Sequence, residues 1–302
     1  GEYYRIFKDR IHVHDSNQDE AMVHIGTSKN GTEMYVNRRG MDAHKIVIIG
    51  SVEPHYFGGY TGGRKSFLPG IASRKTIAQN HRHALKLQAQ ALALNGNPVH
   101  EDMIDALKTI ADKEIFSIQT VLDGERRLYG VTSGHIHESF YAAIDKAQEV
   151  FCVTIPEKAD IVVSVAPYPM DIDLYQSQKA LDNGKLALKQ DGILIMVSKC
   201  RTGIGEPGFF ELLSSSDSPQ KALETIDQGY KLGYHKAAKM AEICTSAQMW
   251  GVTDLDDKDM DAIFIQPFHD LQRALNQALE KKGANARVLF LMDGSITVPM
   301  LK

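Results

Sequence analysis

Short runs of β-branched and apolar residues alternate along this chain with longer stretches in which apolar residues recur every three or four positions. The short runs predict buried strands, and the longer stretches predict amphipathic helices. We expect strands near 45–50, 115–121, 127–132, 160–166, 192–198, 262–265 and 287–292, and helices near 73–94, 100–112, 136–149, 174–188, 218–231, 235–248 and 268–281. Strands that alternate with helices are typical of an α/β protein with a mostly parallel sheet.

A new series of strand, loop and helix units begins in the stretch "TIPEKADIVVSVAP", near residue 155. A chain of 302 residues is long enough for two domains. We therefore expect residues 1–155 to form one domain that is incomplete at its start. We expect residues 156–302 to form a doubly wound, Rossmann-like α/β domain with a C-terminal tail.

Composition and charge exclude several classes of protein. The formal net charge is −4 and no basic block occurs, so a nucleic-acid partner is not indicated. The longest apolar runs, such as "KIVIIG" and "GILIMVS", are too short to span a bilayer. The three cysteines lie far apart without a CxxC pair, which favours neither a disulfide framework nor a thiolate metal site. A reducing, cytoplasmic setting is expected.

The stretch "VEPHYFGGYTGGRKSFLPG", residues 52–70, places two glycine pairs and Lys65 in one loop after a predicted strand. Glycines allow backbone amides to approach a ligand closely. The P-loop pattern G-x-x-x-x-G-K-[ST] is not matched, because Arg64 separates Gly63 from Lys65 and a Leu-Pro-Gly stretch interrupts the following helix. A phosphate- or nucleotide-binding protein that uses this loop without redox chemistry is the alternative function, and a plain surface turn is a further alternative.

Two histidines flank this loop in the sequence. His55 precedes Lys65 by ten residues, and His81 follows it by sixteen. On the helix predicted there, His81 shares a face with apolar residues such as Ile77 and Leu85, so it should point inward. An inward histidine is more often a core residue than a metal ligand. From the residues alone, His55, Lys65 and His81 form a candidate site without an assigned reaction.

The run "EPHYFGGYTGGRKSFLPGIASRKTIAQNH", residues 53–81, resembles the signature of the nickel-pincer lactate racemase family. In that family a histidine, the lysine of Gly-Gly-x-Lys and a later Asn-His occur at these spacings. The upstream stretch "HVHDSNQDEAMVHIGTSKNG" and the downstream stretch "PYPMDIDLYQSQKAL" are also similar to it. The resemblance implies an isomerase, a 2-hydroxy-acid racemase or epimerase, with a cofactor-tethering first domain and an active site in the interdomain cleft.

The resemblance further implies a cofactor, the nickel-pincer nucleotide (nickel pyridinium-3,5-bisthiocarboxylic acid mononucleotide), attached covalently to Lys65. Gly62, Gly63 and Arg64 would contact the cofactor. His81 would be the protein ligand to nickel, a metal that imidazole suits. Maturation proteins would be partners that load the cofactor, so recombinant protein would lack it when they are absent.

The same resemblance assigns roles toward the substrate. His55 would be one of two acid/base histidines, taking the hydroxyl proton as the α-hydrogen leaves as hydride to the nickel-pincer unit. Gln176 and Lys179 share one face of a predicted helix and would bind the substrate carboxylate. The second histidine and an arginine belong to an upstream segment of the family, which we expect this chain to lack. Pocket side chains would choose between lactate, larger hydroxy acids and sugar acids.

Overall fold

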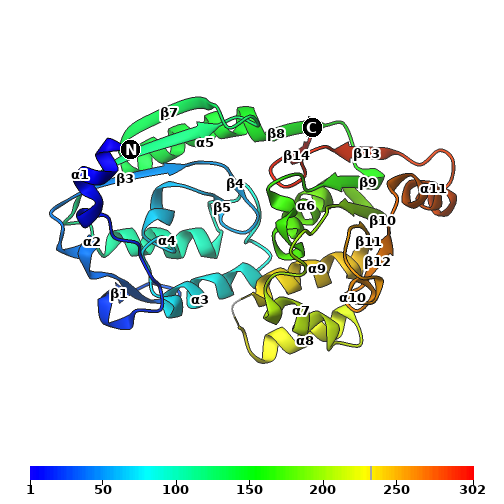
Figure 1. The fold of residues 1–302 in the computed structure, drawn as a ribbon, viewed down its shortest axis with the longest axis horizontal. Coiled ribbons are helices and arrows are strands. Elements are labelled where there is room, and N and C mark those ends of the chain that lie inside the picture. The colour runs from blue at the N-terminus through cyan, green and yellow to red at the C-terminus, as the bar shows by residue number, and fades with distance from the viewer. Residues whose placement is uncertain (232) are drawn as a thin grey trace.

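The structure is a computed structural model that describes residues 1–231 and 233–302. It has two α/β lobes that lie side by side, with the first half of the chain in one lobe and the second half in the other (Figure 1). Strand β8 (Cys152–Ile155) leads from the first lobe to the second and pairs in parallel with the last strand, β14 (Val298–Leu301). The C-terminus therefore returns to the junction of the lobes.

The first lobe is built around a three-stranded sheet in the order β3-β6-β7. Its strands are β3 (Lys45–Ser51), β6 (Glu114–Leu122) and β7 (Leu128–His135). β3 runs parallel to β6, and β7 is antiparallel to it. Helix α5 (Ile136–Phe151) buries Phe140, Ala143 and Ala147 in a cluster with Val121 of β6.

The other elements of the first lobe surround this sheet. They are α1 (Glu2–Phe7), η1 (Lys8–Arg10), η2 (Asp19–Ala21), β1 (Met22–Thr27), β2 (Glu33–Asn37), α2 (Arg38–Asp42), β4 (Pro54–His55), β5 (Gly59–Tyr60), η3 (Gly63–Ser66), α3 (Arg74–Arg82), η4 (His83–Leu85) and α4 (Pro98–Lys108). β1 and β2 form an antiparallel hairpin, as do the two-residue strands β4 and β5. The hairpin of β4 and β5 and the short helix η3 form the glycine-rich loop that the sequence singles out.

The second lobe has a five-stranded parallel sheet in the order β12-β11-β10-β9-β13. The strands are β9 (Ala159–Val165), β10 (Leu188–Val197), β11 (Gln248–Val252), β12 (Ile265–Phe268) and β13 (Val288–Leu291). The helices are η5 (Met170–Ile172), α6 (Leu174–Leu186), α7 (Pro207–Ser214), α8 (Pro219–Gln228), α9 (Tyr234–Ser246), α10 (Asp257–Asp261) and α11 (Leu271–Lys282).

Both faces of this parallel sheet are covered. Val162 and Leu194 belong to a core that α6, α7, α8 and α9 complete, whereas Ile161 and Ile195 pack with α11 on the opposite face. Adjacent strand residues alternate between the two cores because successive side chains of a strand point to opposite faces. The predicted doubly wound, mostly parallel α/β fold is confirmed.

Several predicted boundaries are wrong for tertiary reasons. The helix expected over 73–94 ends at Arg82 and is followed only by the short turn η4. Beyond it, the Leu92 amide donates to Gly59 O at 3.1 Å, and this bridge to the glycine loop replaces the helix. The strand expected at 262–265 starts only at Ile265, after helix α10. The sequence patterns also missed the hairpin β1–β2 and the interior strand β11.

Two further properties bear on the expected setting of the protein. Within the described residues, no helix is both long and apolar enough to cross a membrane. Cys152, Cys200 and Cys244 are all free thiols. Burial raises the pKa of each of them, so these thiols are poor nucleophiles.

Candidate active site

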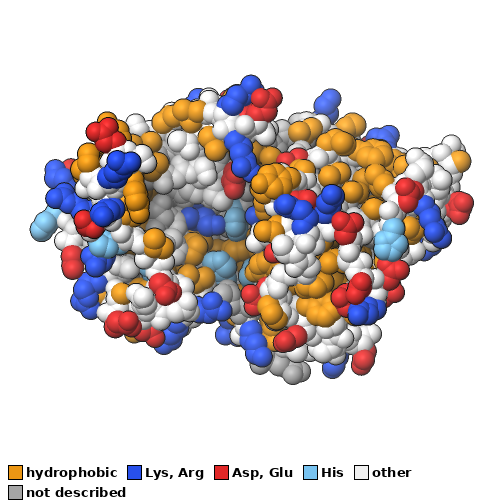
Figure 2. Space-filling model, viewed as in Figure 1, with side chains coloured by type: hydrophobic (Ala, Val, Ile, Leu, Met, Phe, Trp, Pro, Cys, Tyr) orange, Lys and Arg blue, Asp and Glu red, His pale blue; other side chains and the backbone are white. Residues whose placement is uncertain are grey.

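A cavity of about 270 Å³ lies between the two lobes. The loop after β3 forms one wall, with Glu53, His55 and Tyr56, and helix α6 contributes Lys179 and Asn183 to the other. The second wall also includes residues that follow β9 and β13, two neighbouring strands between which the chain order of the sheet reverses. Open α/β sheets bind ligands at this switch point. Figure 2 shows a hollow between the halves, with basic and histidine side chains at its floor.

Gly62 and Gly63 let the loop pack against its own lobe. Gly62 has φ +80°, and a Cβ there would lie 2.6 Å from both Gln119 Oε1 and a methyl of Val52. The Gly63 amide donates to Gln119 Oε1 at 3.0 Å, and a Cβ on Gly63 would crowd the ring of Phe140 at 3.1 Å. These glycines therefore shape the loop from its inner side, and their predicted contact with a cofactor stays a prediction.

Arg64 is buried beneath the loop, with 1% of its surface exposed. Its guanidinium donates to Gly58 O at 2.7 Å and lies 4.3 Å from the centroid of the Phe140 ring. Burial lowers the pKa of Arg64 to about 9. This arginine does not line the interlobe cavity, and its contacts are those of a residue that holds the loop in shape.

The backbone amides of the loop are largely used by the loop itself. The Lys65 amide donates to Gly62 O at 3.1 Å, and the amides of Phe67 and Leu68 donate to Arg64 O. A phosphate-binding loop needs such amides free to point at the ligand. This hydrogen bonding disfavours the alternative in which the loop cradles a phosphate or nucleotide.

Lys65 and His81 approach the same aromatic ring from two ends of one segment. Lys65 Nζ lies 6.0 Å from the centroid of Phe57, and the His81 ring lies 5.0 Å from it, edge to face. Burial, followed by the positive charges of Arg64 and Lys179, lowers the pKa of Lys65 to about 7. A large fraction of the Lys65 side chains is therefore an uncharged amine at neutral pH, the form that attacks a carbonyl or acyl group.

His81 points inward, as its helical position predicts. Burial, and then the charge of Lys65, lowers the pKa of His81 to about 3, so the imidazole is neutral at physiological pH. Its Nδ1 is buried and lies close to the backbone of Ile77, one helical turn earlier, without a hydrogen bond of ordinary geometry. A neutral, inward imidazole is suited to bind a metal.

His55 lines the cavity and packs edge to face on the same Phe57, with centroids 4.5 Å apart. Its Nδ1 accepts a hydrogen bond from the Gly58 amide at 3.1 Å. Burial, then the charges of Lys65 and His81, holds the pKa of His55 well below its usual value. The resting imidazole is therefore neutral, with its proton on Nε2.

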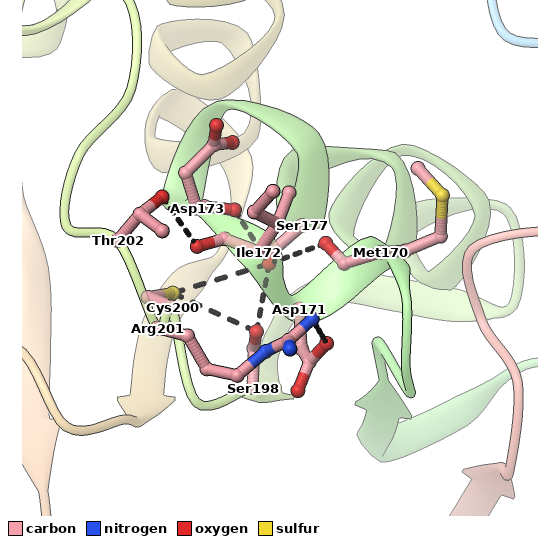
Figure 3. A network of polar contacts seen from close by, with 9 residues as sticks. All are labelled: Met170, Asp171, Ile172, Asp173, Ser177, Ser198, Cys200, Arg201 and Thr202. Carbon is pink, nitrogen blue, oxygen red and sulfur yellow. Dashed lines mark hydrogen bonds and ion pairs between the residues drawn. The ribbon is translucent and has the colours of Figure 1, made fainter.

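Helix α6 brings the second lobe to the site. Asp173 caps this helix by accepting from the Gln176 amide at 2.6 Å, and Lys179 follows one turn later in the cavity wall. Gln176 is half-buried and does not line the cavity. The helix is anchored from below by Ser177, whose hydroxyl lies 2.7 Å from that of Ser198 and donates to Met170 O (Figure 3).

Three site residues escaped the sequence patterns: Tyr56, His235 and Lys236. His235 and Lys236 open helix α9, and each has only 3% of its surface exposed. Their chain position gives no signal, because their contacts with Tyr56 and Tyr175 come from distant parts of the chain. The one available hint is a histidine-lysine pair at the start of a predicted helix.

Three lysines around this cleft have no direct ion-pair partner in the part of the chain that the structure describes. No ion pair of the described residues includes Lys65, Lys179 or Lys236. Burial lowers the pKa of all three ammonium groups, to about 7 for Lys65 and Lys236. A bound anion would favour the charged form of these lysines and offset the cost of burying them.

The residues present fit a metal that arrives with its own ligands. In the described parts of the chain, no group of three or more His, Cys, Asp or Glu side chains could hold a metal ion. His81 can therefore supply one donor, while the remaining donors must come from a second molecule. Lys65, beside the same Phe57 ring, offers an amine to which such a molecule can be attached.

Comparison with known proteins shows which family shares this arrangement. The lactate racemase N-terminal domain matches residues 3–93, and the lactate racemase C-terminal domain matches residues 154–298. The lactate racemase of Thermoanaerobacterium thermosaccharolyticum is 31% identical over 297 residues, covering 93% of this chain and 67% of that protein. The lactate racemase of Lactiplantibacillus plantarum is 32% identical over 298 residues, covering 95% of this chain and 69% of that protein.

Solved structures with a similar fold include a member of the same family. The lactate racemase apoprotein from T. thermosaccharolyticum superposes with a TM-score of 0.91 at 30% identity, covering 95% of this chain and 70% of that one. A Thermotoga maritima protein with a TM-score of 0.71 is only 16% identical, covering 96% of this chain and 78% of that one, and shares the fold alone. The matching domains and relatives extend over most of this two-lobed chain, which therefore belongs to the lactate racemase family and is an isomerase.

Proposed function

We propose that this protein interconverts the configurations of a 2-hydroxy acid by hydride transfer, using a nickel-pincer nucleotide tethered to Lys65. The observation that carries the proposal is the convergence of Lys65 and His81 on Phe57, where burial lowers the pKa of both side chains. Lactate is the first substrate to test, because the relatives that cover most of this chain are lactate racemases.

The cofactor would be held by one bond and one ligand from the protein. The Lys65 amine would carry it through an acyl-type linkage, and the His81 imidazole would bind the nickel. When bound, the cofactor would supply a hydride acceptor and donor at C2 of the substrate. Gly62, Gly63 and Arg64 would contribute through the shape of the loop that presents Lys65. Separate maturation proteins would be needed to load the cofactor.

His55 would handle the hydroxyl proton. In the resting structure its Nε2 holds a proton and can donate a hydrogen bond to a substrate oxygen. To accept the hydroxyl proton at Nε2, the ring must first move its proton to Nδ1, which means releasing the Gly58 amide. This exchange would cost one neutral hydrogen bond, about 1 kcal/mol, which contacts with the bound substrate could offset.

Lys179 would bind the substrate carboxylate, because it is the lysine in the wall of the cavity that His55 also lines. Charge-assisted hydrogen bonds from an ammonium to a carboxylate are among the stronger polar contacts available. Gln176, one helical turn earlier, would reach the substrate only after its side chain turns toward the cavity. The three free cysteines fit a reducing compartment, so we place the enzyme in the cytoplasm.

The test uses protein matured together with its loading proteins and lactate that carries deuterium at C2. Hydride transfer predicts that the inverted product keeps its deuterium in ordinary water. Exchange of the label for solvent hydrogen, with racemisation intact, would mean proton abstraction instead. Other 2-hydroxy acids are assayed in parallel, and failure of all of them with fully loaded protein would contradict the proposal.

A further inference from the structure

His235 connects the two lobes through both nitrogens of its ring. Its Nε2 lies 3.1 Å from the Tyr56 hydroxyl, which belongs to the first lobe. Its Nδ1 lies 3.0 Å from the Tyr230 hydroxyl, five residues earlier in its own lobe. The ring also packs edge to face on Phe57 and His81, at centroid distances of 5.2 Å and 5.7 Å.

The bond between Tyr56 and His235 has a singular position in the molecule. Among the side chains that the structure describes, it is the one hydrogen bond that joins residues 1–151 to residues 156–302. Every ion pair of the described residues stays within one of these two parts. Tyr56 lies between His55 and Phe57, so this bond reaches the backbone that carries the proposed acid/base histidine.

The same contacts exclude a second possible role for His235, that of another metal ligand beside His81. A metal ligand needs a free ring nitrogen, and both nitrogens of His235 are engaged with tyrosine hydroxyls. A neutral imidazole donates from one nitrogen and accepts at the other. One tyrosine must therefore donate while the other accepts, and the three side chains form a single directional chain.

Lys236, the next residue, extends the contact to helix α6. Its ammonium donates to the carbonyl of Tyr175 and lies 3.7 Å from the centroid of the Tyr175 ring. It also lies 5.5 Å from the centroid of Tyr56. The first turn of α9 thus touches the His55 loop, His81 and the start of α6, which are three separate parts of the proposed site.

We propose that His235 is a positioning residue, a latch that holds the two lobes in the relative position at which His55 of one lobe and Lys179 of the other line the same cavity. Its role in catalysis rests on the function proposed above, whereas its role in closing the lobes does not. Catalysis of this kind tolerates little misplacement, because a displacement of about 1 Å can cost roughly 100-fold in rate. Loss of the latch should therefore lower kcat more than it raises KM.

The first experiment compares apoprotein variants by amide hydrogen exchange and small-angle X-ray scattering. Tyr56→Phe removes only the hydroxyl that crosses the cleft, and His235→Leu removes the whole link. Both substitutions should increase the rate of amide hydrogen exchange in residues 54–58 and at the start of α9. Both should also increase the radius of gyration. Tyr129→Phe is the matched control, because the Tyr129 hydroxyl bonds Glu149 within the first lobe.

The second experiment measures kcat and KM of the loaded variants. We expect Tyr56→Phe to lose about 10-fold in kcat and His235→Leu about 10- to 100-fold, with KM changed less than about threefold. His235→Gln should recover part of the loss, because its amide can still meet the Tyr56 hydroxyl. Tyr230→Phe should have a smaller effect than Tyr56→Phe, since the bond across the cleft survives.

The outcomes separate the latch from the proposed function. Exchange and scattering that match the wild type in Tyr56→Phe and His235→Leu would overturn the latch, whatever the activity. If the variants show altered exchange but keep the kcat of the wild type, only the positioning role is overturned. If exchange is altered in the variants but the loaded wild type racemises no 2-hydroxy acid, the latch stands and the proposed function is refuted.

Discussion

Two polar regions of this protein are built in opposite ways. Beneath α6, Ser177, Ser198 and Cys200 contact one another, and Asp171 pairs with Arg201 at 2.9 Å, so the polar side chains there have partners (Figure 3). Around Phe57, in contrast, Lys65 has no ion pair among the described residues and His81 Nδ1 has no hydrogen bond of ordinary geometry.

The difference separates structural polar groups from groups reserved for a ligand. Buried polar atoms are normally paired, and each exception calls for an explanation. A satisfied network fixes geometry, whereas unsatisfied groups hold a free energy penalty that a bound molecule can relieve. The network beneath α6 should therefore govern stability, and the region around Phe57 should govern cofactor binding and catalysis. The predictions below would break or sharpen this distinction.

The largest effect is expected for His81→Ala in matured protein. Removing the one imidazole that can bind the metal should abolish nickel retention and lower activity by at least about 1,000-fold, or about 4 kcal/mol. Nickel content by mass spectrometry and the racemisation rate check this. His83→Ala is the control, since His83 lies against Arg82 and Lys86 in a separate surface pocket, and equal loss of nickel in both variants would contradict the assignment.

Next in size is the effect of His55→Gln, which keeps a polar side chain in the cavity but cannot transfer a proton. The expected loss is about 100- to 10,000-fold in kcat, the usual contribution of a general acid or base. Nickel and the Lys65 adduct should be retained. If nickel disappears from His55→Gln while His81→Ala keeps it, the roles of the two histidines have been exchanged.

A smaller effect is expected where the polar groups are satisfied. Ser198→Ala leaves the buried Ser177 hydroxyl without one of its partners, which should destabilise the fold by about 1–3 kcal/mol. Denaturant unfolding of the apoprotein measures the change, and kcat per folded molecule should stay within about threefold. Ser214→Ala, at an exposed position, should stay within about 0.5 kcal/mol.

The smallest effect has the opposite sign. The pKa of Lys65 is lowered to about 7 in the fold, so between pH 7 and its unfolded value near 10.5 the unfolded chain binds more protons than the folded one. Stability should rise with pH across that window, and Lys65→Met should remove the dependence. Because Lys65 is half-buried, we expect the apoprotein of this variant to be about 1–2 kcal/mol more stable at pH 7.

Thermal unfolding at several pH values checks the Lys65 prediction. The gain from Lys65→Met should be greatest at and below pH 7 and should vanish toward pH 10.5. Lys45→Met is the control, because Lys45 and its partner Glu114 are exposed and their ion pair contributes little. A gain that does not change with pH would contradict the lowered pKa.

Sequence patterns predicted the parts of the fold that depend on local periodicity. Strands β3, β6 and β9 and helices α5, α6 and α9 lie where the hydrophobic pattern places them. Strand β11 was missed because it is defined by parallel pairing with β10 in the middle of a sheet, and its residues follow a helical pattern without a break. The predicted division near residue 155 falls at β8, between the lobes.

The sequence predicted only those candidate site residues that lie within one short motif. Lys65, His55 and His81 lie within a single segment of the sequence, and the structure gathers all three around Phe57. The inner packing of Gly62 and the burial of Arg64 depend on Gln119 and Phe140, which come from distant elements. No spacing rule predicts such contacts, and the same holds for the bond from His235 to Tyr56.

The most direct test of the central claim is the intact mass and nickel content of protein matured with its loading proteins. We predict one adduct of mononucleotide size, mapped by peptide fragmentation to Lys65, together with nickel in the same protein. Lys65→Ala should carry neither, and His81→Ala should keep the adduct but lose the nickel. An adduct on another lysine, or nickel that persists in both variants, would contradict the account.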